Sequence, residues 1–413
     1  MSRLAHILVL AAGVFPASLG GCALGPTALR VNRSQYNEVL RETKTEQLLL
    51  NLVRLKYHEE PLFLDVGSVT TQFTFKESAD IVGTINEGPT RVNPDGLDLS
   101  AGIGYEENPT ITFTPLQGKD FVRHLMSPLQ GEVLVLLSQS GWSIDRILRL
   151  TVQSMNGLDN ASGASGPTPL QPPAYEEFAR ACRMLRSLQK NGLLEMGYES
   201  RRKEVSGPLP LEGISLPDVV EAVRQGYDLC FDDEDKTVVL EKSSPVLVWR
   251  ISEDLRGTAE VREIVQLLGL KPDQNQYEVY VGPPGQFPPG AARGQRTAIT
   301  MVTRSLMGTL FYLSQAIEVP EQHRLKNFVT TTRDSQGQSF PWEDVTGDLL
   351  RVRCRSSRPR DAAVAVQHWG YWHYVDNSHL TSKSTLALLG QLFALQAGGA
   401  EGVAPVLTLP IGG

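Results

Sequence analysis

Three histidines and one aspartate near the carboxyl end of the chain are the residue types best suited to metal or acid–base chemistry. They are His368, His373, Asp376 and His379. Imidazole and carboxylate groups brought together by a hairpin and its following loop bind zinc or a similar ion. The two leading histidines flank a turn expected at Gly370, so the sequence does not fix their directions. The alternative is that all four are polar edges of an aromatic hairpin, and we predict neither a metal nor a cofactor.

Four aromatic residues crowd the same hairpin: Trp369, Tyr371, Trp372 and Tyr374. Exposed rings could stack on the sugars of peptidoglycan or on a partner, whereas buried rings would form the hairpin core. Aromatic residues are enriched in strands and stabilise hairpins through cross-strand pairs. We therefore expect a hairpin core.

Five arginines stand within ten residues of an acidic protein: Arg351, Arg353, Arg355, Arg358 and Arg360. On a strand the first three share one face, and Leu350, Val352 and Cys354 share the other. Guanidinium groups pair well with phosphate and carboxylate, which makes this face a candidate site for lipid head groups, anionic envelope polymers or an acidic partner. The alternative is a solvated face whose charges discourage edge-to-edge pairing.

Sequence motifs for common enzymes are missing. The chain contains no G-x-S-x-G, H-E-x-x-H or G-x-x-x-x-G-K-[ST] pattern, so it lacks the usual signatures of a hydrolase nucleophile, a zinc protease and a phosphate-binding loop. This favours a non-enzymatic role and leaves an anchored enzyme acting on cell-wall or envelope glycans as the open alternative.

The amino terminus has the pattern of an export signal. Met-Ser-Arg precedes an apolar segment, Leu4 to Leu19, that is too short to cross a bilayer as a stable helix. Leu19-Gly20-Gly21-Cys22 resembles the lipobox of bacterial lipoproteins. The resemblance implies cleavage between Gly21 and Cys22, a diacylglycerol on the Cys22 thiol and a fatty acid such as palmitate on the new amino terminus. The alternative is an ordinary secretory peptide cut at Gly20.

The same resemblance predicts the location of the mature chain. Lipoproteins kept in the inner membrane tend to carry aspartate after the cysteine, whereas Ala23 stands here. We therefore expect a lipid anchor in the outer membrane, with the folded body facing the periplasm. The net charge is −7, which gives no reason to expect nucleic acid as a partner. Apart from Cys22, the chain has three cysteines, which allow at most one intramolecular disulfide: Cys182, Cys230 and Cys354.

Hydrophobic periodicity predicts an α+β fold in which amphipathic helices pack on small, mainly antiparallel sheets, in two or three domains. Helices are expected at 35–57, 120–126, 132–140, 143–155, 175–189, 215–225, 298–317 and 382–397. Strands are expected at 69–75, 108–118, 348–355, 362–369 and 371–375, with two more around the acidic turn at 232–235.

Stretches rich in Gly, Ser and Pro suggest domain boundaries. The expected division is a signal peptide at 1–21, a tether at 22–33, an N-terminal α+β domain at 34–157, a linker at 158–173, a middle α+β domain at 174–281, a loop at 282–298 and a C-terminal α+β domain at 299–413.

Two further resemblances bear on function. Residues 215–242, a helix followed by two short strands, are similar to helix-and-strand modules at the periplasmic ends of secretins and receptors. The stretches YNEVLRETKTEQLLLNLVRLKY, RSLMGTLFYLSQAIEVP, SKSTLALLGQLFALQAG and PVLTLPIG look similar to an uncharacterised group of bacterial envelope lipoproteins. Together with the anchor, they lead us to expect a non-enzymatic scaffold or accessory subunit of a cell-envelope assembly, held by the membrane and by envelope protein partners.

Overall fold

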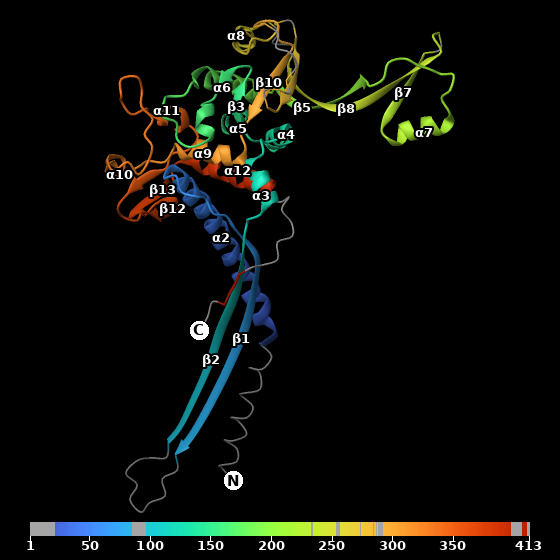
Figure 1. The fold of residues 1–413 in the computed structure, drawn as a ribbon. Helices are drawn as coiled ribbons and strands as arrows, with labels where there is room; N and C mark the ends of the chain where they lie inside the picture. The colour runs from blue at the N-terminus through green and yellow to red at the C-terminus, as the bar shows by residue number, and fades with distance from the viewer. Residues whose placement is uncertain are drawn as a thin grey trace, which may run out of the picture. The chain divides into compact units, whose positions relative to one another are not determined.

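The computed structural model describes residues 21–84, 96–232, 234–252, 257–272, 274–283, 285, 287, 292–397 and 407–410 (Figure 1). These residues form an α+β fold with mostly antiparallel strands, which confirms the predicted fold class. The predicted signal peptide lies outside the described residues except for Gly21, and at Cys22 only the backbone is described. Among the described helices, none is both long and apolar enough to cross a membrane.

The chain divides into two compact units. The larger comprises the residues up to Pro61 together with Leu125–Gln396, and the smaller comprises Leu62–His124 together with the residues from Ala397 onward. The domain boundaries expected at 158–173 and 282–298 do not separate units in this structure.

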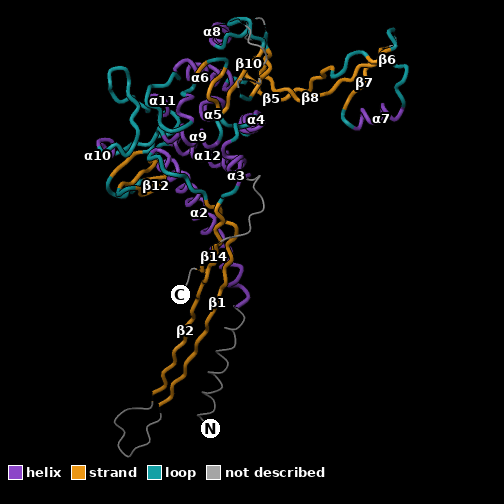
Figure 2. The backbone as a smooth tube through the Cα atoms, in the orientation of Figure 1, coloured by secondary structure: helices purple, strands orange, loops and turns teal. Residues whose placement is uncertain are grey.

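The smaller unit is built on a long antiparallel hairpin. Strand β1 (Leu64–Thr84) pairs with β2 (Gly96–Pro115) along its whole length, with one bulge between Val66 and Ser68, and β14 (Leu407–Pro410) pairs with β2 (Figure 2). Strand β1 contains the shorter strand predicted at 69–75, and β2 contains 108–115 of the strand predicted at 108–118. Helix α3 (Lys119–Met126) follows.

The larger unit begins with helix α2 (Gly21–Lys56), which ends one residue before the predicted helix does and continues it backward through the residues expected to be a tether. Leu49, Leu52 and Val53 are buried on its inner face. The other helices of this unit are α4 (Gly131–Gln139), α5 (Ile144–Thr151), α6 (Glu176–Lys190), α7 (Leu216–Arg224), α8 (Ala259–Leu267), α9 (Leu306–Ser314), α10 (Glu321–Leu325), α11 (Glu343–Thr346) and α12 (Leu380–Ala397), with a 3-10 turn at Ser162–Ser165.

The largest sheet crosses the expected domain boundaries. Its order is β4-β3-β10-β9-β8-β5, and β9 and β10 are its parallel pair. The strands are β3 (Val152–Met155), β4 (Leu158–Asp159), β5 (Leu194–Glu204), β6 (Leu209–Pro210), β7 (Tyr227–Asp232), β8 (Thr237–Ile251), β9 (Gln276–Val281) and β10 (Ala298–Thr303). Because strands from before and after both expected linkers are hydrogen-bonded in one sheet, those segments join parts of a single unit.

Two predicted helices were too long. The segment at 298–317 is strand β10 followed by α9, which Ser305 begins by accepting a hydrogen bond from the amide of Gly308. The helix expected up to Met155 ends at Thr151, where β3 starts. In both segments the apolar and β-branched residues are compatible with a strand as well as with a helix. Pairing with strands distant in the sequence decides which of the two forms.

The expected linker at 158–173 is packed into the unit. Arg304 is fully buried, and its guanidinium donates to the backbone carbonyls of Arg149 and Val152 at 3.1 and 2.8 Å, to that of Asn160, and to Oγ of Ser165. These bonds tie the segment to α5, β3 and the end of β10.

A second, smaller sheet completes the unit, with the order β11-β13-β12. Its strands are β11 (Arg353–Arg355), β12 (Ala362–His368) and β13 (Tyr371–Asp376). The last two are joined by the predicted turn, in which Trp369 and Gly370 both have positive φ. Residues 348–352, expected to extend β11, make an isolated bridge from Val352 to Ile317 instead. The three cysteines of the folded body, Cys182, Cys230 and Cys354, are free.

Candidate functional site

Two of the predicted histidines meet beneath the end of α2. His368 and His373 contact the ring of Tyr57, with centroids 5.2 and 6.2 Å away, and the Tyr57 hydroxyl hydrogen-bonds Nδ1 of His323 at 2.7 Å. A carboxylate oxygen of Glu59 lies 3.4 Å from Nε2 of His368. The sequence reasoning did not include His323 or Tyr57, which are distant in the chain.

This histidine group is part of the core. His373 has no solvent exposure, and neither ring nitrogen has a hydrogen-bond partner among the described residues. Burial, with a smaller contribution from His368 and His323, lowers the pKa of His373 to about 4. The ring is therefore neutral at physiological pH and packs as an aromatic side chain.

The other two predicted residues do not join them. Asp376 accepts hydrogen bonds from the amide and hydroxyl of Ser378, and Nδ1 of His379 bonds the Ser382 hydroxyl at 2.7 Å at the start of α12. Along β13, Asp376 alternates onto the face opposite His373. In the described parts of the chain, no group of three or more His, Cys, Asp or Glu side chains is placed to hold a metal ion.

The arginine strand keeps the predicted alternation. Leu350 and Val352 are buried and Cys354 is partly buried, whereas all five arginines are exposed. Arg351 is held by Glu343 at 3.2 Å and by the carbonyl of Gly347. Arg358 lies over the ring of Trp372, with its guanidinium carbon 5.3 Å from the ring centroid.

The aromatic hairpin has two different faces. Register pairs Arg353 with Tyr374 and Arg355 with Trp372 across β11 and β13, so these rings lie beside the arginines on the outer face. Tyr371, next to His323 at 5.1 Å between centroids, faces inward. The expected hairpin core therefore holds for one face, and the other presents partly exposed rings among cations.

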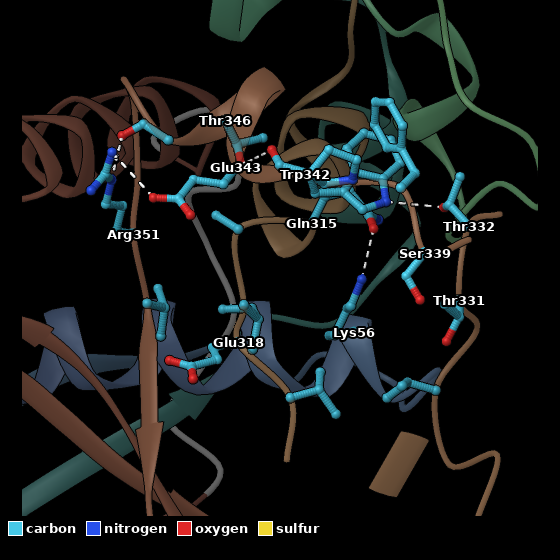
Figure 3. A pocket seen from close by; sticks show the side chains of 18 of the residues that line it. Lys56, Gln315, Glu318, Thr331, Thr332, Ser339, Trp342, Glu343, Thr346 and Arg351 are labelled. Carbon is cyan, nitrogen blue, oxygen red and sulfur yellow. Dashed lines mark hydrogen bonds and ion pairs between the residues drawn. The ribbon is translucent and has the colours of Figure 1, made fainter. Parts of the chain in front are cut away.

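A pocket of about 540 Å³ adjoins the arginine strand (Figure 3). Its wall includes Lys56 at the end of α2, Gln315 after α9, and Arg351 and Arg353. Lys56 is only 6% exposed, and its Nζ donates to Oε1 of Gln315 at 2.8 Å. Gln315 is itself oriented by its Nε2, which donates to the carbonyl of Phe311 at 3.3 Å.

The sequence pattern contained a signal for Lys56 that the prediction missed. Lys56 follows Leu49, Leu52 and Val53 by seven, four and three residues, so it lies on the buried face of α2. A lysine on that face is unusual, because lysine is almost never fully buried unless its charge is paired.

A different kind of surface is formed where β8 leaves the main sheet. Its first half pairs with β7 and β6, and α7 packs on β7 (Figure 1). A capping box between Ser215 and Asp218 starts α7, at the first residue of the helix predicted at 215–225. Leu216, Val220 and Val223, at spacing i, i+4, i+7, are 81, 49 and 59% exposed. We call these three residues the α7 stripe.

Comparison of the chain with protein-family models, curated proteins and solved structures finds no match.

Proposed function

We propose that this chain is a lipid-anchored envelope lipoprotein that acts as a non-enzymatic scaffold or accessory subunit and binds a protein partner through the α7 stripe. The anchor is supported by the lipobox resemblance at Leu19-Gly20-Gly21-Cys22. The diacylglycerol and the amino-terminal acyl chain at Cys22 would hold the chain at the outer membrane. Attachment raises the local concentration, so a modest contact with an envelope partner suffices.

The α7 stripe is the observation that carries the docking role. The strands cover only part of the apolar face of α7. Val219 and Ala222 are half-buried, whereas the three stripe residues face solvent. Clustered exposed apolar residues mark interaction surfaces more often than single ones do.

Charge indicates what kind of partner fits. The segment at 205–242 has nine acidic and three basic side chains. A partner that pairs with this surface would have an apolar groove bordered by basic residues, because such complementarity steers encounter and selects the partner.

Co-purification from detergent-solubilised envelopes tests the proposal. We expect a discrete partner to be recovered with the wild-type chain and recovery to fall at least about tenfold with Leu216→Gln/Val220→Gln, since hot-spot apolar side chains carry most of the binding energy. Leu170→Gln, at a residue 73% exposed elsewhere in the unit, is the matched control. Recovery of the chain alone, or equal recovery with the double variant, would contradict the proposal.

A second candidate function rests on the outer face of the small sheet. Arg353 and Arg355 are exposed beside partly exposed Trp372 and Tyr374. Guanidinium groups bind phosphate and carboxylate, and aromatic rings stack on sugars. This favours an anionic envelope polymer as a ligand of that face.

A further inference from the structure

The pocket at the end of α2 contains a buried ammonium group without a counter-ion. Nζ of Lys56 donates to the neutral amide of Gln315, and no carboxylate of the described residues forms an ion pair with it. Burying an unpaired charge is costly. The cost is apparent in the pKa of Lys56, which burial lowers to about 8. An anion bound beside Nζ would offset it.

A role for Lys56 in balancing the helix dipole does not account for its position. A lysine at a helix carboxyl terminus commonly interacts with the last carbonyl groups. Here the side chain leaves α2 and reaches across to Gln315, so that its ammonium group lies at the pocket wall (Figure 3).

The other charges of the pocket also favour an anion. Arg324, Arg351 and Arg353 line it together with Lys56. The two carboxylates of the wall are already engaged: Glu318 accepts from the amide of Cys354 at 3.0 Å, and Glu343 pairs with Arg351. Cations therefore exceed carboxylates, and the carboxylates do not compete for Lys56.

The remaining wall suits a hydroxylated ring. Thr331 and Ser339 contribute hydroxyl groups to the wall, whereas those of Thr330, Thr332 and Thr346 already bond to His58 and to the carbonyls of Pro169 and Trp342. Phe340 and Trp342 supply apolar surface, and Nε1 of Trp342 is fixed by the hydroxyl of Thr332 at 3.0 Å. The volume of about 540 Å³ lies within the range of small-molecule sites.

We propose that this pocket binds a small anionic sugar, either a sugar acid or a sugar phosphate, whose anionic group pairs with Nζ of Lys56. The hydroxyl groups of the sugar face Thr331 and Ser339, and one face of its ring packs on Phe340 and Trp342. This site is separate from the α7 stripe, and the inference does not rest on the proposed docking function.

Isothermal titration calorimetry of the full chain at pH 7 tests the site with glucuronate, glucose 6-phosphate and glucose as probes. We expect one of the two anionic sugars to bind at least about tenfold more tightly than glucose, since a charge-assisted pair is worth more than a neutral hydrogen bond. A preference between the two anions distinguishes a carboxylate ligand from a phosphate ligand. Equal affinity for glucose, or no binding of either anion at about 10 mM, would overturn the proposal.

The variant Lys56→Met tests whether Lys56 pairs with the anionic group of the ligand. We expect this variant to fold, because it replaces an unpaired buried charge with an apolar side chain of similar length. It should weaken binding of the anionic sugar at least about tenfold and leave the affinity for glucose unchanged. Lys383→Met, on the exposed start of α12, is the matched control. Unchanged affinity in a folded Lys56→Met variant would refute the role of Lys56.

The pH dependence of the wild-type chain keeps the proposal testable if Lys56→Met does not fold. The affinity for the anionic sugar should fall about tenfold for each pH unit above 8, because the ammonium group of Lys56 in the unliganded protein loses its proton. Constant affinity from pH 7 to 10 would exclude pairing with Lys56. The charged groups that face the pocket with it are Glu318, Arg324, Glu343, Arg351 and Arg353.

Discussion

Two buried cations of this protein are accommodated in opposite ways. Arg304 is surrounded by acceptors from α5, β3 and the segment that follows, and its guanidinium carbon lies 4.1 Å from the ring centroid of Tyr312. Lys56 has a single neutral partner. The charge of Arg304 is therefore stabilised within the fold, whereas that of Lys56 remains available to a ligand.

Replacement of Arg304 by methionine should destabilise the larger unit severely. The change removes the charge-assisted hydrogen bonds that Arg304 donates to the carbonyls of Arg149, Val152 and Asn160, and a hydrogen bond to a charged group contributes about 1.5–3 kcal/mol. We expect a loss of about 3–5 kcal/mol in the free energy of unfolding, measured by urea denaturation. Arg360→Met, at an exposed position, is the control and should change stability little. A loss below about 1 kcal/mol for Arg304→Met would contradict the role assigned to Arg304.

The buried His373 should make the protein less stable in mild acid. Its pKa is about 4 when folded, below the 6.5 of a histidine exposed to water, so the unfolded state binds the proton first as the pH falls. The contribution of His373 to the free energy of unfolding is fully present above pH 6.5. It is lost between pH 6.5 and 4, which lowers the free energy of unfolding by about 3 kcal/mol.

His373→Leu removes this titration. The difference in free energy of unfolding between wild type and variant should shift in favour of the variant by about 2–3 kcal/mol from pH 7 to pH 4, as measured by urea denaturation at several pH values. His323 and His368 lie near the ring and remain in both proteins, so their contributions cancel to first order. An equal acid dependence in the two proteins would show that His373 does not titrate differently on folding.

At the scale of elements, the short strand β11 has an apolar side and a cationic side. Cys354 lies on its inner side, next to the buried Val352 that precedes the strand, and its outer side presents Arg353 and Arg355. Arg351 is less available, because Glu343 holds it. The outer arginines, rather than the whole run of five, are therefore the ones to test for polymer binding.

Charge reversal of the outer face should abolish binding of an anionic polymer. With polygalacturonate as the probe, we expect Arg353→Glu/Arg355→Glu to weaken binding at least about tenfold, and wild-type binding to fall with added salt because exposed charges are screened. Sedimentation with the polymer measures both. Arg183→Glu/Arg262→Glu makes the same change in net charge on exposed helical positions and should bind normally. Salt-insensitive binding would exclude the arginine face.

At the scale of the whole molecule, the expected anchor and the folded body can be tested independently. Cys22 precedes Lys56 by 34 residues, and the pocket, the arginine face and the α7 stripe are all formed by residues from Lys56 onward. Loss of the anchor should therefore change location without changing ligand affinity.

Cys22→Ser should release the chain from membranes. We expect the wild type in the outer-membrane fraction, with the mass of its amino-terminal peptide raised by acyl chains, and the variant in the soluble periplasmic fraction without that mass. Cell fractionation and mass spectrometry measure the two effects. Cys354→Ser is the control and should stay with the membrane. A membrane-bound variant lacking acyl chains would contradict the lipobox assignment.

The sequence by itself determined the elements whose residue pattern is local. The helical spacing of α2, α6 and α7, the alternation of β12 and β13, and the turn at Gly370 could be predicted because neighbouring residues in the chain define them. The outward direction of Arg353 and Arg355 followed from the same alternation.

The tertiary structure alone decided which distant residues meet. Residues 298–303 became a strand because β3 and β9 lie on either side of them, and the expected linker at 158–173 is packed because Arg304 reaches it from the end of β10. The Lys56 pocket joins residues about 260–300 positions apart, so no local pattern defines it. Side-chain burial and hydrogen bonding depend on packing between elements, which sequence periodicity does not specify.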